Sequence, residues 1–303
     1  MYNHRRQLVG PAVYADAWKS VLTVATSHAL YRIACAHSNK FIPFLQANPE
    51  REDYMEFYTS IAPFYDRIFP FDEDLPTFIM GLAGGQTKKI LDIGCATGHL
   101  PNALAKRGNE VVGIDLDPEM VRLAKGRFQN THCSFQVADM TWLDRHFLPE
   151  TFDMVCCFGN TLVHLPDRKS ITATLRQARL LLRPEGLLIG QIIHYDRILD
   201  GRLEGLPTIV RKGLRFERKY LYRDGDPLIS FQTSLTLEGC SEPVINTVPL
   251  YPIRAEELAQ CILDAGFGPV EFCADTDRTT LDASSVALYF VACVDPAATI
   301  RET

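Results

Sequence analysis

Between residues 89 and 193, the hydrophobic positions form short apolar runs that alternate with longer amphipathic stretches. The short runs are typical of buried strands, whereas the amphipathic stretches have the period of helices. Alternation of this kind indicates a parallel sheet with helices on both faces. The predicted strands are Lys89–Ile93, Glu110–Ile114, Ser134–Val137, Phe152–Phe158 and Leu187–Ile193, and the helices are Leu100–Arg107, Pro118–Phe128 and Ser170–Leu182.

Further elements are predicted on both sides of this region. The stretch Phe57–Phe69 reads as an amphipathic helix, and Leu75–Ala83 as a second helix that ends at a pair of glycines. Near the other end, the pattern predicts a helix at Arg254–Ala265 and strands at Val270–Cys273 and Ser285–Cys293. The sequence therefore predicts a doubly wound, mostly parallel α/β sheet of seven strands.

Residues 196–250 depart from this pattern, because apolar and polar positions alternate there with a period of two. The dipeptide Asp224-Gly225 lies between two such segments and is a strong signal for a tight hairpin turn. We predict an antiparallel insert after the fifth strand of the sheet. The alternating positions are Leu214, Phe216, Arg218, Tyr220 and Tyr222, then Ile229, Phe231, Thr233, Leu235 and Leu237.

The composition is that of a soluble globular domain, with 47% hydrophobic and 22% charged residues. The net charge of −6 argues against nucleic acid as the main ligand. Nine cysteines without a Cys-x-x-Cys pair argue against a metal site and a disulfide framework, and predict reduced thiols in a cytoplasmic protein. No uninterrupted apolar run reaches about 18 residues, so we expect no membrane span.

The N-terminal segment, residues 1–54, differs from the rest, since its first 50 residues hold five Lys or Arg and only two Asp or Glu. Three interpretations stay open. It could be an organelle transit peptide, which is typically Arg-rich and acid-poor. It could result from an upstream start codon, with the working protein beginning near Met55, or it could be a helical extension that packs on the main domain at residues 55–303.

The turn after the first predicted strand carries the most specific chemical signal. It reads Asp92-Ile93-Gly94-Cys95-Ala96-Thr97-Gly98. Glycines allow close approach of a ligand, and this turn lies at the edge of the sheet where ligands bind. The dinucleotide pattern Gly-x-Gly-x-x-Gly is not met, because Ala96 and His99 occupy its later glycine positions. A carboxylate such as Asp92 repels a pyrophosphate but suits a ligand with a cationic group.

Carboxylates also follow the next two predicted strands. Asp115 at the end of the second strand can accept both hydroxyls of a ribose. Asp117, directly before Pro118, fits better as the cap of the next helix. After the third strand, Asp139 can accept the exocyclic amine of adenine, and Met140 can lie against the ring. Together these residues describe a nucleoside with a cationic tail.

As a set, these motifs resemble those of the class I S-adenosylmethionine-dependent methyltransferases. The resemblance covers roughly residues 56–195 and implies a Rossmann-like fold with S-adenosylmethionine as the cofactor. The cofactor-binding residues that we predict are Tyr65, Asp92, Gly94, Cys95, Ala96, Gly98, Asp115, Leu116, Met120, Asp139, Met140, Gly159, Asn160 and Leu162.

A narrower resemblance involves residues 152–167, where a Gly-Asn turn is followed by His-Leu-Pro-Asp. This segment is similar to the fourth-strand segment of glycine N-methyltransferase and its relatives. The Tyr195-Asp196 pair after the fifth strand, the Leu250-Tyr251-Pro252 segment and the antiparallel insert resemble the same family. The resemblance implies that Gly159, Asn160, Thr161 and Leu162 border the methionine part of the cofactor, with His164 nearby.

The sequence departs from that family two residues before Tyr195. The family has an Arg there that holds the carboxylate of the amino-acid acceptor, whereas this chain has Ile193. We therefore predict that glycine is a poor substrate and that the acceptor is larger and less acidic. An Arg from the insert, Arg211 or more specifically Arg218, is a candidate replacement.

Methyl transfer from a sulfonium is an in-line displacement in which positioning and exclusion of water supply most of the rate. We predict an enzyme that methylates a small-molecule acceptor on nitrogen, with the insert at residues 196–250 over the active site. The alternatives are an O-methyltransferase of a metabolite or natural product, and a catalytically idle S-adenosylmethionine-binding module. The candidate catalytic residues are His164 and Tyr195, and the candidate substrate-binding residues are His194, Tyr195, Arg218 and Tyr251. The oligomeric state stays open.

Overall fold

The computed structural model describes residues 57–295 of the 303-residue chain. The three interpretations of residues 1–54 concern a segment outside the described residues. Within residues 57–295, no helix combines the length and hydrophobicity that a bilayer crossing requires.

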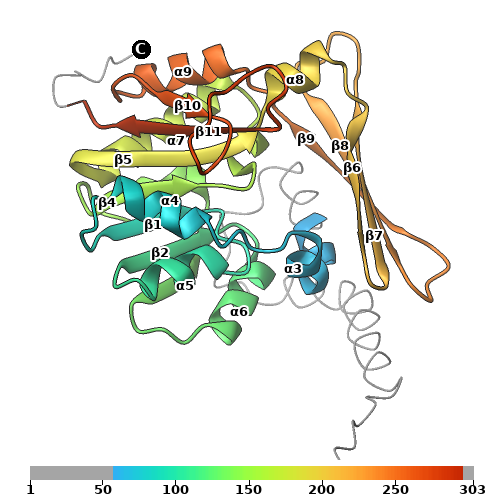
Figure 1. The fold of residues 1–303 in the computed structure, drawn as a ribbon, viewed down its shortest axis with the longest axis horizontal. Helices are drawn as coiled ribbons and strands as arrows, with labels where there is room; N and C mark the ends of the chain where they lie inside the picture. Colours follow the sequence, from blue (N-terminus) through green and yellow to red (C-terminus); the bar gives the residue numbers. More distant parts are fainter. Residues whose placement is uncertain (1–56, 296–303) are drawn as a thin grey trace, which may run out of the picture. The chain divides into compact units, whose positions relative to one another are not determined.

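The larger sheet has seven strands in the order β10-β11-β5-β4-β1-β2-β3 (Figure 1). Its parallel strands are β1 (Lys89–Ile93), β2 (Glu110–Asp115), β3 (Cys133–Val137), β4 (Phe152–Cys157) and β5 (Leu182–Ile193). Strand β11 (Ala287–Cys293) pairs antiparallel with β5, and β10 (Glu271–Cys273) pairs antiparallel with β11. This arrangement confirms the predicted fold class.

Helices cover both faces of this sheet. The helices are α4 (Leu75–Leu82), α5 (His99–Ala105), α6 (Pro118–Arg127), α7 (Arg168–Leu181), α8 (Tyr195–Asp200) and α9 (Ala255–Asp264). Ile90 packs in the cluster that contains residues of α4 and α5, whereas its neighbour Leu91 packs in the cluster that contains residues of α7 and α9. Both side chains are fully buried, which explains why successive positions of this strand are apolar.

Two carboxylates begin helices as their positions in the sequence predict. Asp117 accepts hydrogen bonds from the backbone N–H groups of Glu119 and Met120 and caps α6, so the capping role assigned to it is confirmed. Asp167 accepts a hydrogen bond from Ser170 N and caps α7. These caps satisfy N–H groups that have no partner inside a helix.

Most predicted elements agree with the structure to within two residues, and two differ more. The helix predicted at Phe57–Phe69 is interrupted, because residues 57–61 are helical and are followed by a 3-10 turn, η1 (Ala62–Phe64), and by α3 (Tyr65–Ile68). Pro63 lacks the N–H that a continuous helix needs. Strand β5 begins at Leu182, five residues before the predicted start, and its register with β4 shifts between Leu182 and Leu187.

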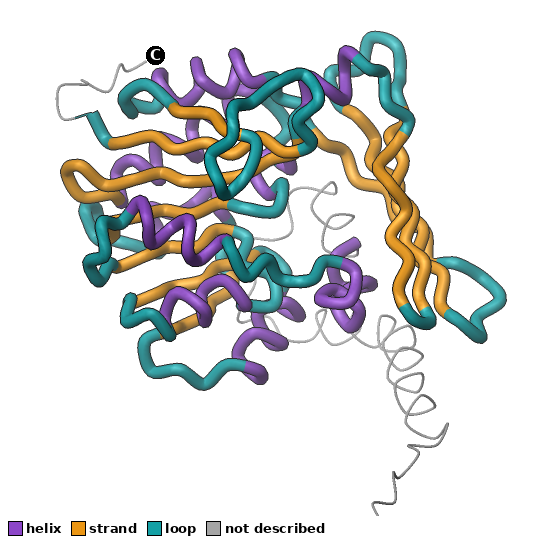
Figure 2. Tube along the Cα trace, viewed as in Figure 1, coloured by secondary structure: helices purple, strands orange, loops and turns teal. Residues whose placement is uncertain are grey.

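The insert forms a second sheet of four antiparallel strands, which confirms its predicted place after β5. Its strands are β6 (Gly205–Arg211), β7 (Leu214–Leu221), β8 (Ile229–Leu237) and β9 (Val244–Leu250), paired in chain order. The predicted hairpin is β7–β8, and β6 and β9 extend it on both sides. Figure 1 shows this sheet opposite the edge at which the parallel strands end, and Figure 2 shows short helices and loops between the two sheets.

Candidate functional site

The loop after β1 turns sharply at two glycines. Gly94 has a φ of +74°, and a Cβ atom at this position would lie 2.5 Å from Thr161 Oγ1. Gly98 has a φ of +84°, and a Cβ atom there would lie 2.7 Å from the Phe135 ring. Both positions therefore need glycine for backbone conformation and for space. The loop consequently lies directly against the turn after β4.

Between these glycines, Cys95 and Ala96 contribute backbone to the loop. The Cys95 side chain packs beneath the loop on β2, since a Cβ atom at Gly113 would lie 2.9 Å from Cys95 Cβ. Ala96 has a φ of +45° and donates its backbone N–H to Asp115 Oδ2 at 2.8 Å. The loop thus presents main-chain atoms, and its thiol is buried.

Asp115 at the end of β2 is held by the backbone on both sides. Its Oδ2 accepts from Ala96 N, and its Oδ1 accepts from Asp117 N at 2.9 Å. Burial raises the pKa of Asp115 to about 6, although these hydrogen bonds act in the opposite direction. A carboxylate oxygen can accept more than one hydrogen bond. Asp115 is therefore fixed in place and still able to accept hydrogen bonds from a pair of hydroxyls.

Asp92 lies on the neighbouring strand, and its side chain is only 3% exposed. Burial, with a further contribution from the charge of Asp115, raises the pKa of Asp92 well above its usual range. No hydrogen bond from the described residues reaches its carboxylate. A buried carboxylate in this situation is stabilised by a cation, which fits the expected contact with a positively charged ligand.

Tyr65 comes to this edge of the sheet from α3. Burial raises its pKa, and the charges of Asp115, Asp66, Cys95 and Asp92 raise it further, so its hydroxyl lies among the carboxylates of the site. The next residue, Asp66, accepts a hydrogen bond from Thr97 Oγ1 at 2.5 Å and forms an ion pair with Arg127. These contacts fasten α3 to the loop after β1 and to α6.

On its other side, α3 contacts the insert. The Arg67 guanidinium donates a hydrogen bond to the carbonyl of Lys212 in the β6–β7 turn. Phe69, directly after the helix, packs edge-on against Phe216 of β7 with ring centroids 5.7 Å apart. Helix α3 therefore connects the loop after β1 with the four-stranded sheet (Figure 1).

The turn after β4 carries Asn160 in the left-handed region, with a φ of +69°. Its Oδ1 accepts a hydrogen bond from Ile193 N, and its Nδ2 donates one to Tyr195 Oη, both at 3.0 Å. Because the backbone N–H of Ile193 requires an acceptor, the orientation of the amide is fixed. Gly159 N donates to Gln191 Oε1 at 3.1 Å, so this turn is held by the end of β5.

The two candidate catalytic residues keep neutral side chains. His164 ends the 3-10 helix η3 (Thr161–His164), and its Nε2 lies 3.1 Å from Tyr58 Oη. Burial lowers the pKa of His164 to about 3. Burial, and then the nearby Tyr220 hydroxyl, raise the pKa of Tyr195 well above its usual range. A phenol with so high a pKa stays protonated at neutral pH, and the catalytic role of Tyr195 stays a prediction.

Two predicted substrate-binding residues are held by other parts of the protein. His194 Nδ1 lies 3.1 Å from the Ser285 carbonyl, and its Nε2 lies 3.5 Å from Asp196. Tyr251 donates its hydroxyl to Glu257 Oε1 of α9 at 2.6 Å. Both side chains therefore have partners within the protein, and their contact with a substrate stays a prediction.

The residues predicted to contact adenine lie after β2 and β3. Asp139 Oδ1 accepts hydrogen bonds from the backbone N and Oγ1 of Thr141 and begins the 3-10 helix η2 (Met140–Arg145). Met140 is partly buried against the main core, Leu116 is also partly buried, and Met120 is 1% exposed. Asp139 thus acts as a local cap, and the contact of these residues with adenine stays a prediction.

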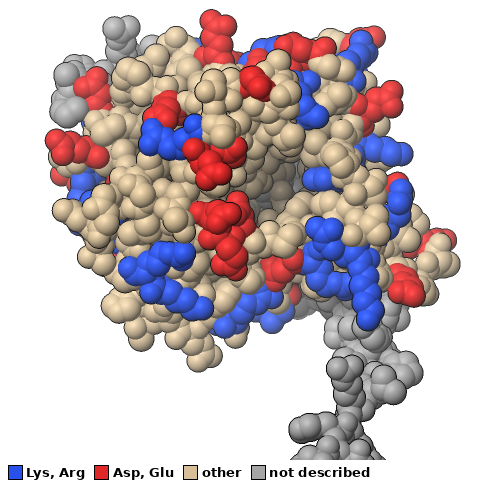
Figure 3. Space-filling model, in the orientation of Figure 1, with Lys and Arg blue, Asp and Glu red and all other residues tan. Residues whose placement is uncertain are grey.

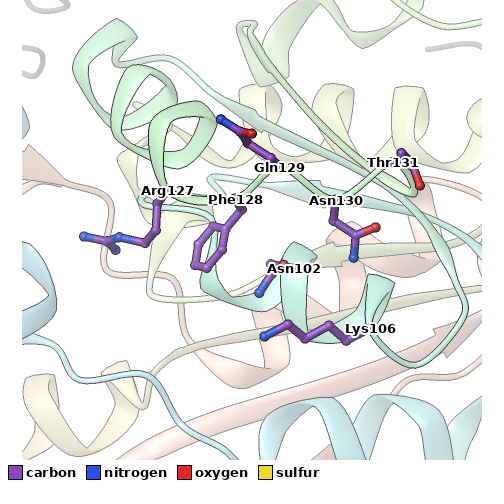
Figure 4. Close-up of a pocket in the computed structure, with 7 residues that line it drawn as sticks. All are labelled: Asn102, Lys106, Arg127, Phe128, Gln129, Asn130 and Thr131. Atoms are coloured by element: carbon purple, nitrogen blue, oxygen red, sulfur yellow. The ribbon is translucent and has the colours of Figure 1, made fainter.

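A hollow lies between the two sheets. Figure 3 shows it with acidic side chains on the rim toward the larger sheet and basic side chains over the four-stranded sheet. A different, open groove lies beside α5 and the segment after α6 (Figure 4). It is lined by Asn102, Lys106, Arg127, Phe128, Gln129, Asn130 and Thr131, which include none of the predicted site residues.

Comparison with known proteins gives a consistent assignment. A family model described as a methyltransferase domain matches residues 90–186. The glycine/sarcosine/dimethylglycine N-methyltransferase of Actinopolyspora halophila is 29% identical over 205 residues, which represent 67% of this chain and 35% of that relative. The ubiquinone biosynthesis O-methyltransferase of Aeromonas salmonicida is 33% identical over 141 residues, which represent 44% of this chain and 57% of that relative.

The fold is shared with a solved structure of an S-adenosylmethionine-dependent methyltransferase from Clostridium acetobutylicum. The TM-score is 0.66 at 15% sequence identity, and the match covers 78% of this chain and 99% of that chain. The family match at residues 90–186 includes the loop after β1, Asp115 and the Asn160 turn. This family match also confirms S-adenosylmethionine as the predicted cofactor. The chain thus contains a class I S-adenosylmethionine-dependent methyltransferase domain.

Proposed function

We propose that this methyltransferase transfers the methyl group to a nitrogen of a small-molecule acceptor. One observation carries this choice: the two candidate bases, His164 and Tyr195, have pKa values that make them poor proton acceptors. A neutral amine attacks through its own lone pair and needs no base before the transfer, whereas a hydroxyl acceptor needs one. The similarity to an N-methyltransferase that acts on glycine, sarcosine and dimethylglycine supports the same choice.

The residues at the carboxyl edge fit the cofactor. A Cβ atom at Gly94 would fill space next to Thr161, and Asp92 is a buried carboxylate to which none of the described residues donates a hydrogen bond. When bound, S-adenosylmethionine supplies the methyl group on a sulfonium. In our proposal, Asp92 binds its ammonium group and Asp115 its ribose hydroxyls. The loop at Gly94–Gly98 and the turn at Gly159, Asn160 and Leu162 border its methionine part, while Leu116, Met120, Asp139 and Met140 contact the adenine.

The remaining residues position the acceptor. Tyr195 Oη accepts a hydrogen bond from Asn160 and shares a second one with the Tyr220 hydroxyl, so Tyr195 links the turn after β4 with the four-stranded sheet that covers the acceptor. Tyr65 covers the carboxylates, and the four-stranded sheet excludes water from the hollow. Since Ile193 replaces the carboxylate-holding Arg of the resembling family, we propose that glycine is a poor acceptor. Positioning of this kind supplies most of the acceleration in a direct displacement.

The pH dependence of kcat/KM tests the choice of nitrogen. With a series of primary amines of different basicity, we expect the acidic limb of the profile to move with the pKa of the amine, because only the neutral amine reacts. An acidic limb that stays at one pH for every amine would assign the proton to an enzyme base and would contradict the proposal.

One observation favours O-methyl transfer as the second candidate. The ubiquinone biosynthesis O-methyltransferase of Aeromonas salmonicida resembles this chain, and the four-stranded sheet contributes the aromatic residues Phe216 and Phe231 to the main core cluster, a composition that suits an aromatic acceptor nearby. That match, however, represents only 44% of this chain. A phenol would require a proton acceptor, so turnover of phenols at neutral pH with a fixed enzyme pKa would favour this candidate.

A further inference from the structure

Two buried polar atoms on the inner face of the four-stranded sheet, Arg218 Nε and Thr233 Oγ1, have no hydrogen-bond partner among the described residues. They are directly opposite each other in the β7–β8 register, and Tyr220 follows two residues later on the same face of β7. The Tyr220 hydroxyl shares a hydrogen bond with the Tyr195 hydroxyl. Buried polar atoms are almost always hydrogen-bonded in folded proteins. The two neighbouring exceptions indicate a ligand that completes their hydrogen bonds.

These atoms lie on the face of the sheet that packs toward the rest of the protein. Thr233 is 1% exposed and Tyr220 is 3% exposed, and Phe216 on the same face is fully buried. Tyr220 lies near Tyr195, because its hydroxyl contributes to the raised pKa of Tyr195. Tyr195 is in turn hydrogen-bonded to Asn160 after β4. Polar groups therefore extend from the proposed methionine site to the four-stranded sheet.

The chemistry of this cluster favours an anion. The Arg218 guanidinium donates one hydrogen bond, from Nη2 to the Pro207 carbonyl at 2.7 Å, and no carboxylate of the described residues forms an ion pair with it. The segment 205–223 contains six basic residues and one acidic residue, in a chain whose net charge is −6. A partly buried guanidinium without a counter-ion is stabilised by an oxyanion, and its planar shape matches a carboxylate.

We propose that Arg218, Tyr220 and Thr233 form a subsite for a carboxylate of the acceptor, at a distance from the nitrogen that receives the methyl group. The inference rests on the proposed nitrogen-directed function. Since the subsite lies on the insert and Ile193 occupies the corresponding position on β5, the nitrogen and the carboxylate of the acceptor must be further apart than in glycine. The acceptor class is accordingly an amino carboxylate with a spacer of several bonds.

The test compares ω-amino carboxylates of increasing length, from glycine to 5-aminovalerate, with primary alkylamines of the same lengths. We expect kcat/KM to be highest for an amino carboxylate longer than glycine, and about tenfold or more above that of its matched alkylamine, because the carboxylate forms charge-assisted hydrogen bonds. Arg218→Met should abolish this preference, and Thr233→Val should raise the KM several-fold. Arg215→Met is the matched control, because Arg215 lies on the same strand, is exposed and pairs with Glu217.

A binding measurement separates this inference from the proposed function. Calorimetric titration of the S-adenosylhomocysteine complex with 4-aminobutyrate and with butylamine should show tighter binding of 4-aminobutyrate, dependent on Arg218. Arg218→Gln serves as a second variant if Arg218→Met melts at a lower temperature than the wild type.

Equal kcat/KM for amino carboxylates and alkylamines would overturn the subsite and leave the nitrogen-directed function standing. Methylation on oxygen, together with Arg218-dependent binding of carboxylates, would overturn the nitrogen-directed function and leave the subsite standing. Failure of every ω-amino carboxylate in the series to bind would also overturn the subsite.

Discussion

The two walls of the hollow differ in how their polar groups are held. On the wall formed by the larger sheet, backbone N–H groups of Ala96 and Asp117 fix both oxygens of Asp115. On the wall formed by the four-stranded sheet, Arg218 Nε and Thr233 Oγ1 have no hydrogen-bond partner within residues 57–295. The first wall is thus organised before any ligand binds, whereas a ligand must complete the second. A cofactor common to a whole class suits the first, and an acceptor particular to one enzyme suits the second.

The largest effect should come from removing the fixed carboxylate. Asp115→Ala eliminates two charge-assisted hydrogen bonds to the ribose, each worth about 1.5–3 kcal/mol, and it also frees the loop after β1. We expect S-adenosylmethionine affinity to fall by about two orders of magnitude or more, measured by titration calorimetry. Asp264→Asn, an exposed carboxylate on α9, is the control. Unchanged affinity in Asp115→Ala would show that Asp115 does not bind the cofactor, and the contrast drawn between the two walls would then be wrong.

A second test concerns the shape of the loop. Gly94→Ala should lower the free energy of unfolding by about 1–3 kcal/mol, because it forces a left-handed backbone and a contact with Thr161. Gly81→Ala is the matched control, because no atom lies within 4 Å of the added Cβ and the residue lies in α4. Chemical denaturation of both variants measures the difference. Equal stability of the two variants would show that the loop is not organised as described.

A third test uses pH. The buried Asp115 has a pKa of about 6 without ligand, and ribose hydroxyls favour its ionised form. Ligand binding should therefore release protons, and affinity should rise by up to about tenfold per pH unit below pH 6 and level off above it. The raised pKa of Asp92 acts in the same direction. Calorimetry in buffers of different ionisation enthalpy counts the protons, and Asp115→Asn should reduce the slope.

The same shift has the opposite consequence for the unliganded protein. A carboxyl whose folded pKa is raised makes the folded state less stable as pH rises from about 4 to 6. The melting temperature without cofactor should consequently decrease over this range, and Asp115→Asn should flatten the decrease. If the melting temperature of the wild type increased over this range, and Asp115→Asn had the same pH dependence, the pKa of Asp115 would not be raised.

The smallest expected effect concerns α3, the helix that connects the two walls. Asp66→Asn weakens the ion pair with Arg127 and the contact with Thr97, which hold α3 over the loop. Because such partly exposed pairs contribute about 0–1 kcal/mol, we expect cofactor affinity to fall only a few-fold. Glu73→Gln, an exposed residue of the adjoining segment, should leave it unchanged. An effect as large as that of Asp115→Ala would mean that α3 itself forms the cofactor site.

Sequence patterns were sufficient for the larger sheet because both of its faces are buried. Strands with consecutive buried apolar positions, such as Ile90 and Leu91 in β1, have few alternative structures, and Asp117 before Pro118 identifies the start of α6. The break at Pro63 and the early start of β5 could not be predicted in the same way. They depend on packing and on register with a neighbouring strand, which local patterns do not contain.

The candidate site likewise contains residues that local sequence patterns predict and residues that depend on how the strands are assembled. The glycines and carboxylates of the loop after β1 are specific in type and spacing, so the sequence predicts that they lie together. His194 and Tyr251 had only a resemblance in their favour, and the structure shows them bonded to Ser285 and Glu257 instead. Tyr220 and Thr233 gave no signal beyond the alternation of β7 and β8. The position of their hydroxyls beside Arg218 becomes visible only when the strands are assembled.

The position of the transferred methyl group tests the central claim most directly. Wild-type protein would be incubated with S-adenosylmethionine labelled with carbon-13 on its methyl group and with an acceptor that offers both an amine and a hydroxyl, such as an amino alcohol. The account predicts a carbon-13 NMR signal of an N-methyl product, absent with Asp115→Ala. A signal of an O-methyl product from the wild type would contradict it.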